Sequence, residues 1–183
     1  NLSQIEIELA HPEAAAAHAV AWEAQLRALG LAAAKPYESF IRGQLALRQG
    51  HAARALPLFA RALRQAGAGN VEGRILFLAY SARAHLAAGD PARALAATRR
   101  ACKLHRAAGL ASLDAIERSE LWWRHSQALR TCGLDAEADE ALAQAWRFVL
   151  DSVESLGDEG LRRNVLNKPE ATREIVRAWL SHA

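Results

Sequence analysis

The sequence has little of what several fold classes require. Its 183 residues include only two cysteines, five prolines and no methionine. Because Cys102 and Cys132 lie far apart, a disulfide-stapled scaffold and a zinc knuckle are not expected; we interpret both as reduced thiols of a cytoplasmic protein. No run of 18 apolar residues occurs, so a membrane-spanning helix is not expected either. A starting methionine and a signal-peptide pattern are both missing, and we expect the chain to be a piece of a longer protein.

Charge of one sign is not in large excess. The 23 lysine and arginine residues and the 20 acidic residues give a formal net charge of +3. This imbalance does not indicate nucleic acid or an anionic membrane as the partner. Five basic residues gather on one predicted helix: Arg93, Arg99, Arg100, Lys103 and Arg106. We interpret them as a solvated outer face, because RNA-reading helical repeats need polar side chains that recur from repeat to repeat, and the sequence has no such recurrence.

Alanine is the residue that the chain has in excess. It makes up roughly a quarter of the sequence, far more than in an average protein. Alanine is the best helix former, whereas valine and isoleucine, which favour strands, are scarce here. The composition therefore predicts an all-α protein.

Three similar segments follow one another along the chain. Each is centred on a glycine: Gly50 in LRQGHAARA, Gly89 in LAAGDPARA and Gly133 in RTCGLDAEA. A small residue lies seven positions before each glycine, and alanines lie five and twelve positions after it. These nine small residues are Gly43, Ala82, Ser126, Ala55, Ala94, Ala138, Ala62, Ala101 and Ala145. Since the glycines are 39 and 44 residues apart, the sequence predicts a repeated structural unit of about that length.

A weaker copy opens the chain. Residues 12–31, PEAAAAHAVAWEAQLRALGL, parallel residues 91–110, PARALAATRRACKLHRAAGL, from the leading proline to the closing Gly-Leu. This copy departs from the pattern at Trp22, where the other copies carry a small alanine. We expect one domain over residues 1–183, with repeats at about residues 1–31, 35–66, 72–109 and 114–156.

Each copy predicts two antiparallel helices that meet at its glycine. Glycine is favoured where a helix ends, because it tolerates left-handed backbone conformation. Asp90 and Pro91 suit the N-cap and the first residue of the next helix. The small residues then lie on facing sides of the two helices, whose axes can approach to roughly 8–10 Å. Pro57 conflicts with the pattern, since it removes a hydrogen bond inside a predicted helix, and we expect a bend there.

The spacing of small and aromatic residues resembles the tetratricopeptide repeat (TPR). The residues that carry the resemblance are Gly43, Gly50, Ala55, Phe59 and Ala62; Thr98 and Leu142 replace the aromatic residue in later copies. The periods exceed the usual 34 residues. In this they are similar to the arrays of bacterial multidomain proteins such as MalT-like regulators and ATPase–sensor kinases. The resemblance covers the chain to about residue 150 and implies a right-handed α-solenoid of antiparallel helix pairs.

The pattern changes after about residue 154. Asp158 can cap a short helix, and Pro169 can open a last helix with an apolar stripe that includes Ile175 and Trp179. We interpret residues 157–183 as a C-terminal helical cap, because the open end of a solenoid must be covered. The alternative is a contact site in the LRRNVLNKP segment, where basic and amide side chains crowd together.

The TPR resemblance also implies a binding groove. In TPR arrays the first helix of each pair lines a concave groove, and counting from the glycines places nine side chains there. They are Tyr37, Phe40, Gln44, Arg48, Arg83, Leu86, Trp123, Gln127 and Arg130. Aromatic rings and guanidinium groups suit the capture of a peptide that carries carboxylates. For Phe40 and Trp123 a place in the core is the alternative; of the pair Trp122-Trp123, we expect Trp122 in the core and Trp123 exposed.

Motifs for catalysis and metal binding are missing. The sequence has no HExxH, GxSxG or CxxC motif, and its seven histidines lack partners at metal-ligand spacing. The glycines of AGAGN, residues 66–70, follow a predicted helix rather than a strand, so we interpret them as a linker and not as a phosphate loop. We expect no enzyme activity, cofactor or metal.

Taken with the TPR resemblance, the sequence predicts a non-enzymatic scaffold for protein–protein interaction. It would be a module of a larger bacterial signalling or transcriptional regulatory protein, and its groove would bind a peptide or another domain of the same chain. The alternative is an effector-sensing module that holds a small molecule inside the superhelix. A homodimer stays open, because dimerisation can also cover the faces of a helical array.

Overall fold

The computed structural model of the protein describes residues 35–114, 116–167 and 169–181, and six positions before residue 35. Within these ranges the chain is all-helical, as its composition predicts. The predicted first copy, with Trp22, lies outside the described residues apart from those six positions, and so does Lys168 of the LRRNVLNKP segment. The described helices are α3 (Lys35–Arg48), α4 (Ala52–Gln65), α5 (Val71–Ala87), α6 (Pro91–Ala107), α7 (Arg118–Thr131), α8 (Asp135–Glu154), α9 (Glu159–Asn167) and α10 (Glu170–Leu180).

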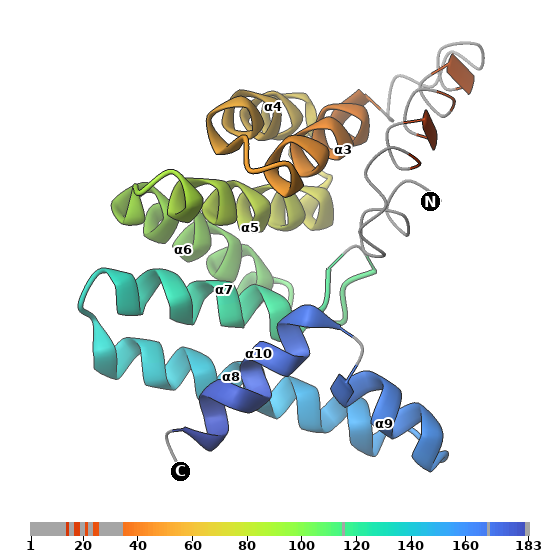
Figure 1. The fold of residues 1–183 in the computed structure, drawn as a ribbon, viewed down its shortest axis with the longest axis vertical. Helices are drawn as coiled ribbons and strands as arrows, with labels where there is room; N and C mark the ends of the chain where they lie inside the picture. Colours follow the sequence, from red (N-terminus) through yellow and green to blue (C-terminus); the bar gives the residue numbers. More distant parts are fainter. Residues whose placement is uncertain are drawn as a thin grey trace.

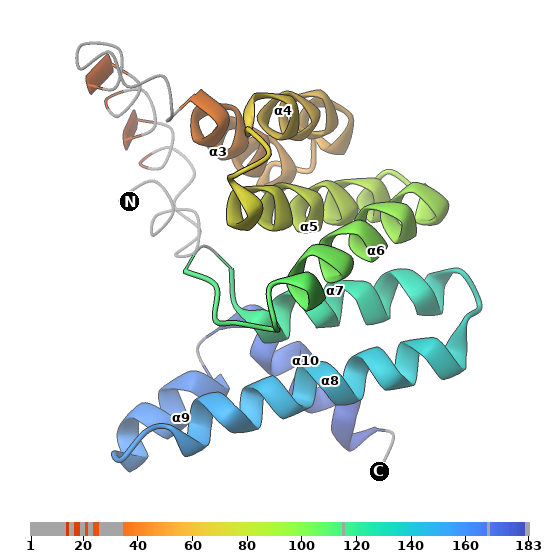
Figure 2. The same cartoon turned by 180° about the vertical axis from the view of Figure 1, so that it is seen from behind.

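Six of these helices form three hairpins. α3 packs against α4, α5 against α6 and α7 against α8, and successive hairpins touch through α4 with α5 and α6 with α7. Figure 1 shows the hairpins one below another from α3 and α4 to α7 and α8, and Figure 2 shows the same order from behind. The prediction of packed neighbouring helix pairs is confirmed for the described part of the chain.

Left-handed glycines end the first helix of each hairpin. The backbone φ angle is 78° at Gly50, 75° at Gly89 and 73° at Gly133, a conformation that side chains with a Cβ seldom adopt. After each glycine, the next N–H donates to the carbonyl five residues earlier, in the bonds His51 to Ala46, Asp90 to His85 and Leu134 to Leu129. This is the Schellman arrangement, so the three helix ends follow one local rule.

The nine small repeat residues lie buried between the helices. The seven alanines among them are 0% exposed. The hydroxyl of Ser126 donates to the carbonyl of Ala138 at 2.8 Å, across the α7–α8 hairpin. At Gly43 in α3 there is no room for a side chain, because a Cβ would lie 2.5 Å from the ring of Phe59 in α4. The small residues therefore permit the close approach of the paired helices.

The last two helices return along the stack. α10 packs against α7, α8 and α9, and it lies on the face of the molecule that also carries α3, α5 and α7 (Figure 1). Its apolar side faces α8: Ile175 is fully buried, and Trp179 stacks on Trp146 with ring centroids 5.8 Å apart. α9 is held more loosely, because none of its residues is buried. This arrangement carries the polar side of α10 towards the first helices of the hairpins.

Candidate functional site

A cavity of about 470 Å³ opens between α5 and α7. The described residues that line it supply three guanidinium groups, an indole and an amide, and none of them carries a carboxylate. They are Arg83 and Leu86 from α5 and Trp123, Arg124, Ser126, Gln127, Arg130 and Thr131 from α7. Five of the nine predicted groove residues line this cavity. The repeat explains four of them, because Arg83 and Gln127 lie six residues before their glycines, and Leu86 and Arg130 lie three before.

Two predicted groove residues belong to the core instead. Phe40 is 3% exposed and Gln44 is 2% exposed, so neither can line an accessible surface. The ring of Phe40 packs against Phe77 and Tyr80 of α5, with centroids 5.2 and 5.0 Å away, and Gln44 hydrogen-bonds the Tyr80 hydroxyl. The aromatic side chains of α5 cover this part of α3. The core alternative therefore holds for Phe40, and the groove prediction for Gln44 is wrong.

The remaining two predicted residues on α3 lie outside the cavity. Tyr37 is half-buried, edge-on to the ring of Phe77, and its hydroxyl accepts a hydrogen bond from Asn70 at 3.5 Å. Arg48 lies near the end of α3 and forms an ion pair at 3.8 Å with Glu170 of α10. Of the two, only Arg48 takes part in the polar contacts that connect the face.

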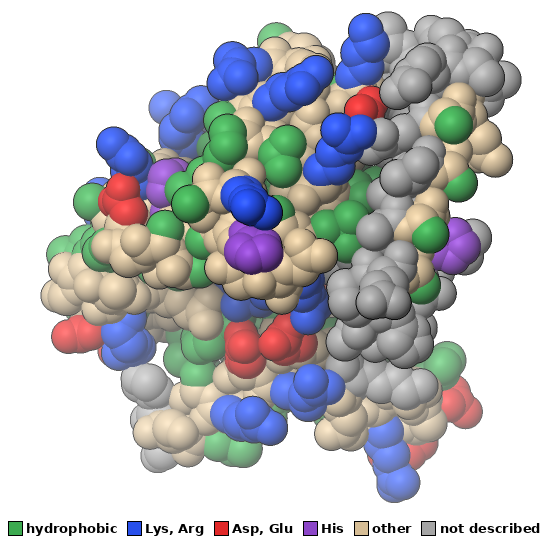
Figure 3. All heavy atoms as spheres, turned by 45° about the horizontal axis from the view of Figure 1, so that its top comes forward, with side chains coloured by type: hydrophobic (Ala, Val, Ile, Leu, Met, Phe, Trp, Pro, Cys, Tyr) green, Lys and Arg blue, Asp and Glu red, His purple; other side chains and the backbone are tan. Residues whose placement is uncertain are grey.

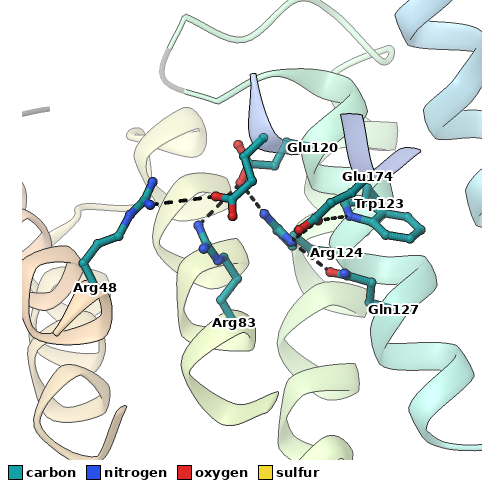
Figure 4. Close-up of polar contacts among 8 residues, drawn as sticks. Arg48, Arg83, Glu120, Trp123, Arg124, Gln127 and Glu174 are labelled. Carbon is teal, nitrogen blue, oxygen red and sulfur yellow. Dashed lines mark hydrogen bonds and ion pairs between the residues drawn. The ribbon is translucent and has the colours of Figure 1, made fainter. Parts of the chain in front are cut away.

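A chain of ion pairs runs along the edge of the cavity (Figure 4). Glu120 of α7 lies between two guanidinium groups, 3.9 Å from that of Arg83 in α5 and 3.3 Å from that of Arg124 in its own helix. Arg124 continues the chain to Glu174 of α10, at 3.1 Å, and also donates to the amide oxygen of Gln127 at 3.0 Å. The side chains of α5, α7 and α10 are thereby connected through alternating charges.

Arg124 is the central residue of this chain. Its side chain is only 7% exposed, and its buried Nε atom has no hydrogen-bond partner among the described residues. A buried guanidinium is stabilised only if carboxylates compensate the water that it loses. Glu120 is one such carboxylate, and Glu174 from α10 is the other. Arg124 therefore depends on a carboxylate that a different part of the chain supplies.

The electrostatic effect of Glu120 extends to a neighbouring phenol. Burial raises the pKa of Tyr80 to about 12, and the negative charge of Glu120 contributes to the rise. Arg83 and Arg124 act in the opposite direction on this pKa, and the guanidinium of Arg83 lies 5.5 Å from the centre of the Tyr80 ring. Tyr80 thus stays a neutral hydroxyl beneath the ion pairs.

The side chains of the two adjacent tryptophans, Trp122 and Trp123, lie in different environments. Trp122 is buried, as predicted, and its indole N–H donates to Nδ1 of His105 at 3.0 Å. Trp123 is half-buried rather than openly exposed, because its indole N–H donates to Glu174 of α10 at 2.6 Å. Of the two rings, only that of Trp123 lines the α5–α7 cavity.

Arg130 lines the cavity near the C-terminal end of α7 and pairs with carboxylates of α8. Its guanidinium contacts Asp139 at 2.5 Å and Asp135 at 3.5 Å, both at the start of α8. The side chains of all three are well exposed, so these pairs are screened by solvent and contribute little to stability. Arg130 can exchange these partners for a ligand carboxylate at small cost.

A second cavity, of about 350 Å³, lies between α6, α7 and α8, and Trp122 and His125 are among its lining residues. The hydroxyl oxygen of Thr98 lies 3.2 Å from the carbonyl oxygen of Leu95 and 2.9 Å from Nδ1 of His125, within hydrogen-bond distance of both. Burial lowers the pKa of His125 to about 4, with help from the charges of Arg106 and Arg99, so the ring is neutral at pH 7.

The sequence does not reveal four residues of these ion pairs: Glu120, Arg124 and Glu174 of the chain, and Glu170, which pairs with Arg48. The only available signal is spacing, because each glutamate lies four residues from a second charged member of the set and so shares a helix face with it. That spacing cannot show that α10 returns to α7. Among the described residues, no group of three histidine, cysteine or acidic side chains is placed to hold a metal ion.

The described helices also include none that is long and apolar enough to cross a membrane. The basic residues of α6 are exposed, in agreement with their interpretation as a solvated face. No family of known proteins, no curated protein and no solved structure matches this chain.

Proposed function

We propose that the chain is a TPR-like, right-handed α-solenoid that acts as a non-enzymatic scaffold for protein–protein interaction. In this proposal it is a cytoplasmic module of a larger bacterial signalling or transcriptional regulatory protein. The close-packed hairpins with left-handed glycines support the repeat assignment. The face formed by α3, α5 and α7 is then the groove that binds a peptide or another domain of the same chain.

The observation that carries this proposal is the chemistry of the α5–α7 cavity. Its described lining presents three arginines, an indole and an amide and includes no carboxylate, and a carboxylate of the chain itself, on Glu174, already lies at its edge. Arginine and tryptophan are the side chains that contribute most to protein–protein interfaces. An acidic segment is therefore the partner that the cavity suits.

The charge of the first described hairpin favours the same partner. Residues 35–66 contain six basic side chains and one acidic side chain, a net charge of +5 with histidine neutral. All six basic residues are exposed: Lys35, Arg42, Arg48, Arg54, Arg61 and Arg64. Lysine and arginine dominate this end of the molecule in the space-filling view (Figure 3). A surface of this kind accelerates the approach of an acidic partner and disfavours a basic one.

The test is affinity capture with two matched double variants. Arg83→Glu with Arg130→Glu reverses two charges in the cavity, whereas Arg100→Glu with Arg147→Glu makes the same change in charge at exposed positions of α6 and α8, outside the cavity lining and outside the basic first hairpin. A protein that the wild type and the α6/α8 variant retain, and the cavity variant loses, supports the proposal. If the cavity variant keeps its helical content and still captures every protein that the wild type captures, the proposal is wrong.

A small anionic effector is the second candidate ligand. The volume of about 470 Å³ falls within the range of small-molecule sites, and three guanidinium groups suit a carboxylate or a phosphate. Mass spectrometry of the same captured material separates the two functions. A small molecule that is lost with the cavity variant, in the absence of a protein partner, would favour the effector-sensing alternative.

A further inference from the structure

The C-terminal helix α10 occupies part of the proposed groove in the way that a bound acidic segment would. Glu170 and Glu174 lie one helical turn apart on α10, and both point to arginines of the first helices of hairpins. Glu170 forms an ion pair with Arg48 of α3. Glu174 reaches Arg124 and the indole N–H of Trp123 in α7 (Figure 4). The contacts of α10 thus define a ligand that fits this face: a helix with two carboxylates at positions i and i+4.

We propose that α10 is an internal competitor for an external acidic helix. The partner would carry two carboxylates one turn apart, place them on Arg48 and Arg124, and displace α10 from the face. This inference rests on the proposed function, since it names the partner and the control of the same groove.

The attachment of α10 allows such a displacement. It has 11 residues, which is too short for a stable helix in isolation, so its order depends on its contacts. Only Ala171, Thr172 and Ile175 are buried in it. The preceding helix α9 has no buried residue, so α10 can leave the face while α9 moves with it and the hairpins stay packed.

A partner helix with a net negative charge would bind this face more tightly than α10 does. The two glutamates of α10 are balanced by Arg173 and Arg177, so the helix as a whole is neutral. The face that it covers continues into the first described hairpin, which has a net charge of +5. A partner helix with the same two carboxylates and without the two arginines gains attraction that α10 lacks, and this gain should shrink as salt is added.

The experiment uses the full chain and a synthetic peptide of residues 169–181, PEATREIVRAWLS, labelled with fluorescein at its N-terminus. Fluorescence anisotropy measures its affinity for the wild type and for Glu170→Gln with Glu174→Gln, in which the chain's own helix is a weaker competitor. The matched control is Glu140→Gln with Glu154→Gln, which removes the same charge from exposed positions of α8. We expect the peptide to bind the α10 variant at least about tenfold more tightly than the wild type or the control, because two ion pairs, one to a buried arginine, no longer compete.

Variant peptides test the chemistry of the ligand. A peptide with glutamine in place of both glutamates should lose most of its affinity for the α10 variant. A peptide with glutamine in place of both arginines should bind more tightly than the parent peptide. The indole N–H resonance of Trp123 in a ¹H–¹⁵N spectrum reports the contact directly: it should shift in the α10 variant and return towards its wild-type position when the parent peptide is added.

The outcomes separate the inference from the function on which it rests. If the peptide binds all three chains equally, and Arg83→Glu with Arg130→Glu abolishes that binding, the groove function stands and competition by α10 is overturned. If the peptide binds none of the chains, the acidic-helix site and the proposed groove are both overturned. If light scattering finds a wild-type dimer that the α10 variant does not form, Glu170 and Glu174 bind the face of a second copy of the chain. The proposal of an external partner is then overturned.

Discussion

The substitution Gly43→Ala tests the close approach of α3 and α4. Alanine is usually favoured over glycine inside a helix by up to ~1 kcal/mol, so without tertiary contacts the change would stabilise α3. In the folded chain the new Cβ would lie 2.5, 2.8 and 3.0 Å from three ring atoms of Phe59. These distances are far below van der Waals contact, so either the ring or the helix has to move.

The ring of Phe59 has little freedom to move. It is 0% exposed, and it packs against Phe40 and Tyr80 with ring centroids 5.9 and 6.2 Å away. Overpacking of this kind typically costs ~1–3 kcal/mol, which outweighs the gain in helix propensity. We therefore expect a net loss of about 1–2 kcal/mol, and for a chain of this size a decrease in Tm of about 2–8 °C.

The assay is thermal and urea unfolding followed by circular dichroism at 222 nm. Gly160→Ala is the matched control, because Gly160 lies in the exposed helix α9, and among the described residues the new Cβ would approach one side-chain atom, a carboxylate oxygen of Asp158 at 3.0 Å. Adding Phe59→Leu to Gly43→Ala should recover part of the loss, since the smaller side chain makes room for the methyl group. A Gly43→Ala protein as stable as the wild type would refute the packing of α3 against α4 described above.

Three further predictions concern stability. Ala94→Leu should lower the free energy of unfolding in urea by ~1–3 kcal/mol, because Ala94 is fully buried where α5 packs on α6. A variant as stable as the wild type would contradict this register of the helix pair. Asp90→Ala should cost about 1 kcal/mol by the same assay, since Asp90 Oδ1 accepts from the N–H of Arg93 and caps α6, whereas Asp90→Asn should retain most of the stability. The pKa of His125 is about 4 in the folded chain and 6.5 in the unfolded chain. Between these values the unfolded chain binds a proton more readily, so lowering the pH favours unfolding. The free energy of unfolding should therefore be about 2 kcal/mol lower at pH 5 than above pH 6.5. His125→Asn can keep the bond to Thr98 and should reduce this dependence on pH in urea titrations, and an unchanged dependence would show that His125 is not its source.

The hairpins could be predicted from the sequence because their determinants are local. A left-handed glycine ends each first helix, and small residues at fixed distances from it mark the seam. The groove residues could be predicted only in part. Gln44 and Gln127 occupy equivalent positions six residues before a glycine, yet Gln44 is buried and Gln127 lines the cavity. The difference depends on which side chains a neighbouring helix presents, and the repeat pattern does not contain that information.

The return of α10 could not be predicted for a related reason. Glu174 meets Trp123 and Arg124 across about 50 residues of sequence. The apolar stripe of α10 predicts that the helix packs on something, but it does not determine which helices lie beneath its polar side. The burial of Ile175 and the stacking of Trp179 on Trp146 fix the orientation of α10, which directs its glutamates towards α7 and α3.

The contact between Glu170 and Arg48 joins the last described helix to the first described hairpin, past the hairpin of α5 and α6. In a stack where each unit touches only its neighbours, the two ends fray independently, and local melting of one end leaves the other unaffected. A bond that skips the intervening unit changes this behaviour, because opening at α10 then loosens α3 as well. The pair is exposed and worth at most about 1 kcal/mol, a factor of about five in an opening equilibrium. The two ends of the described part should therefore melt as weakly coupled regions, with the middle hairpin as the last part to lose protection from hydrogen exchange.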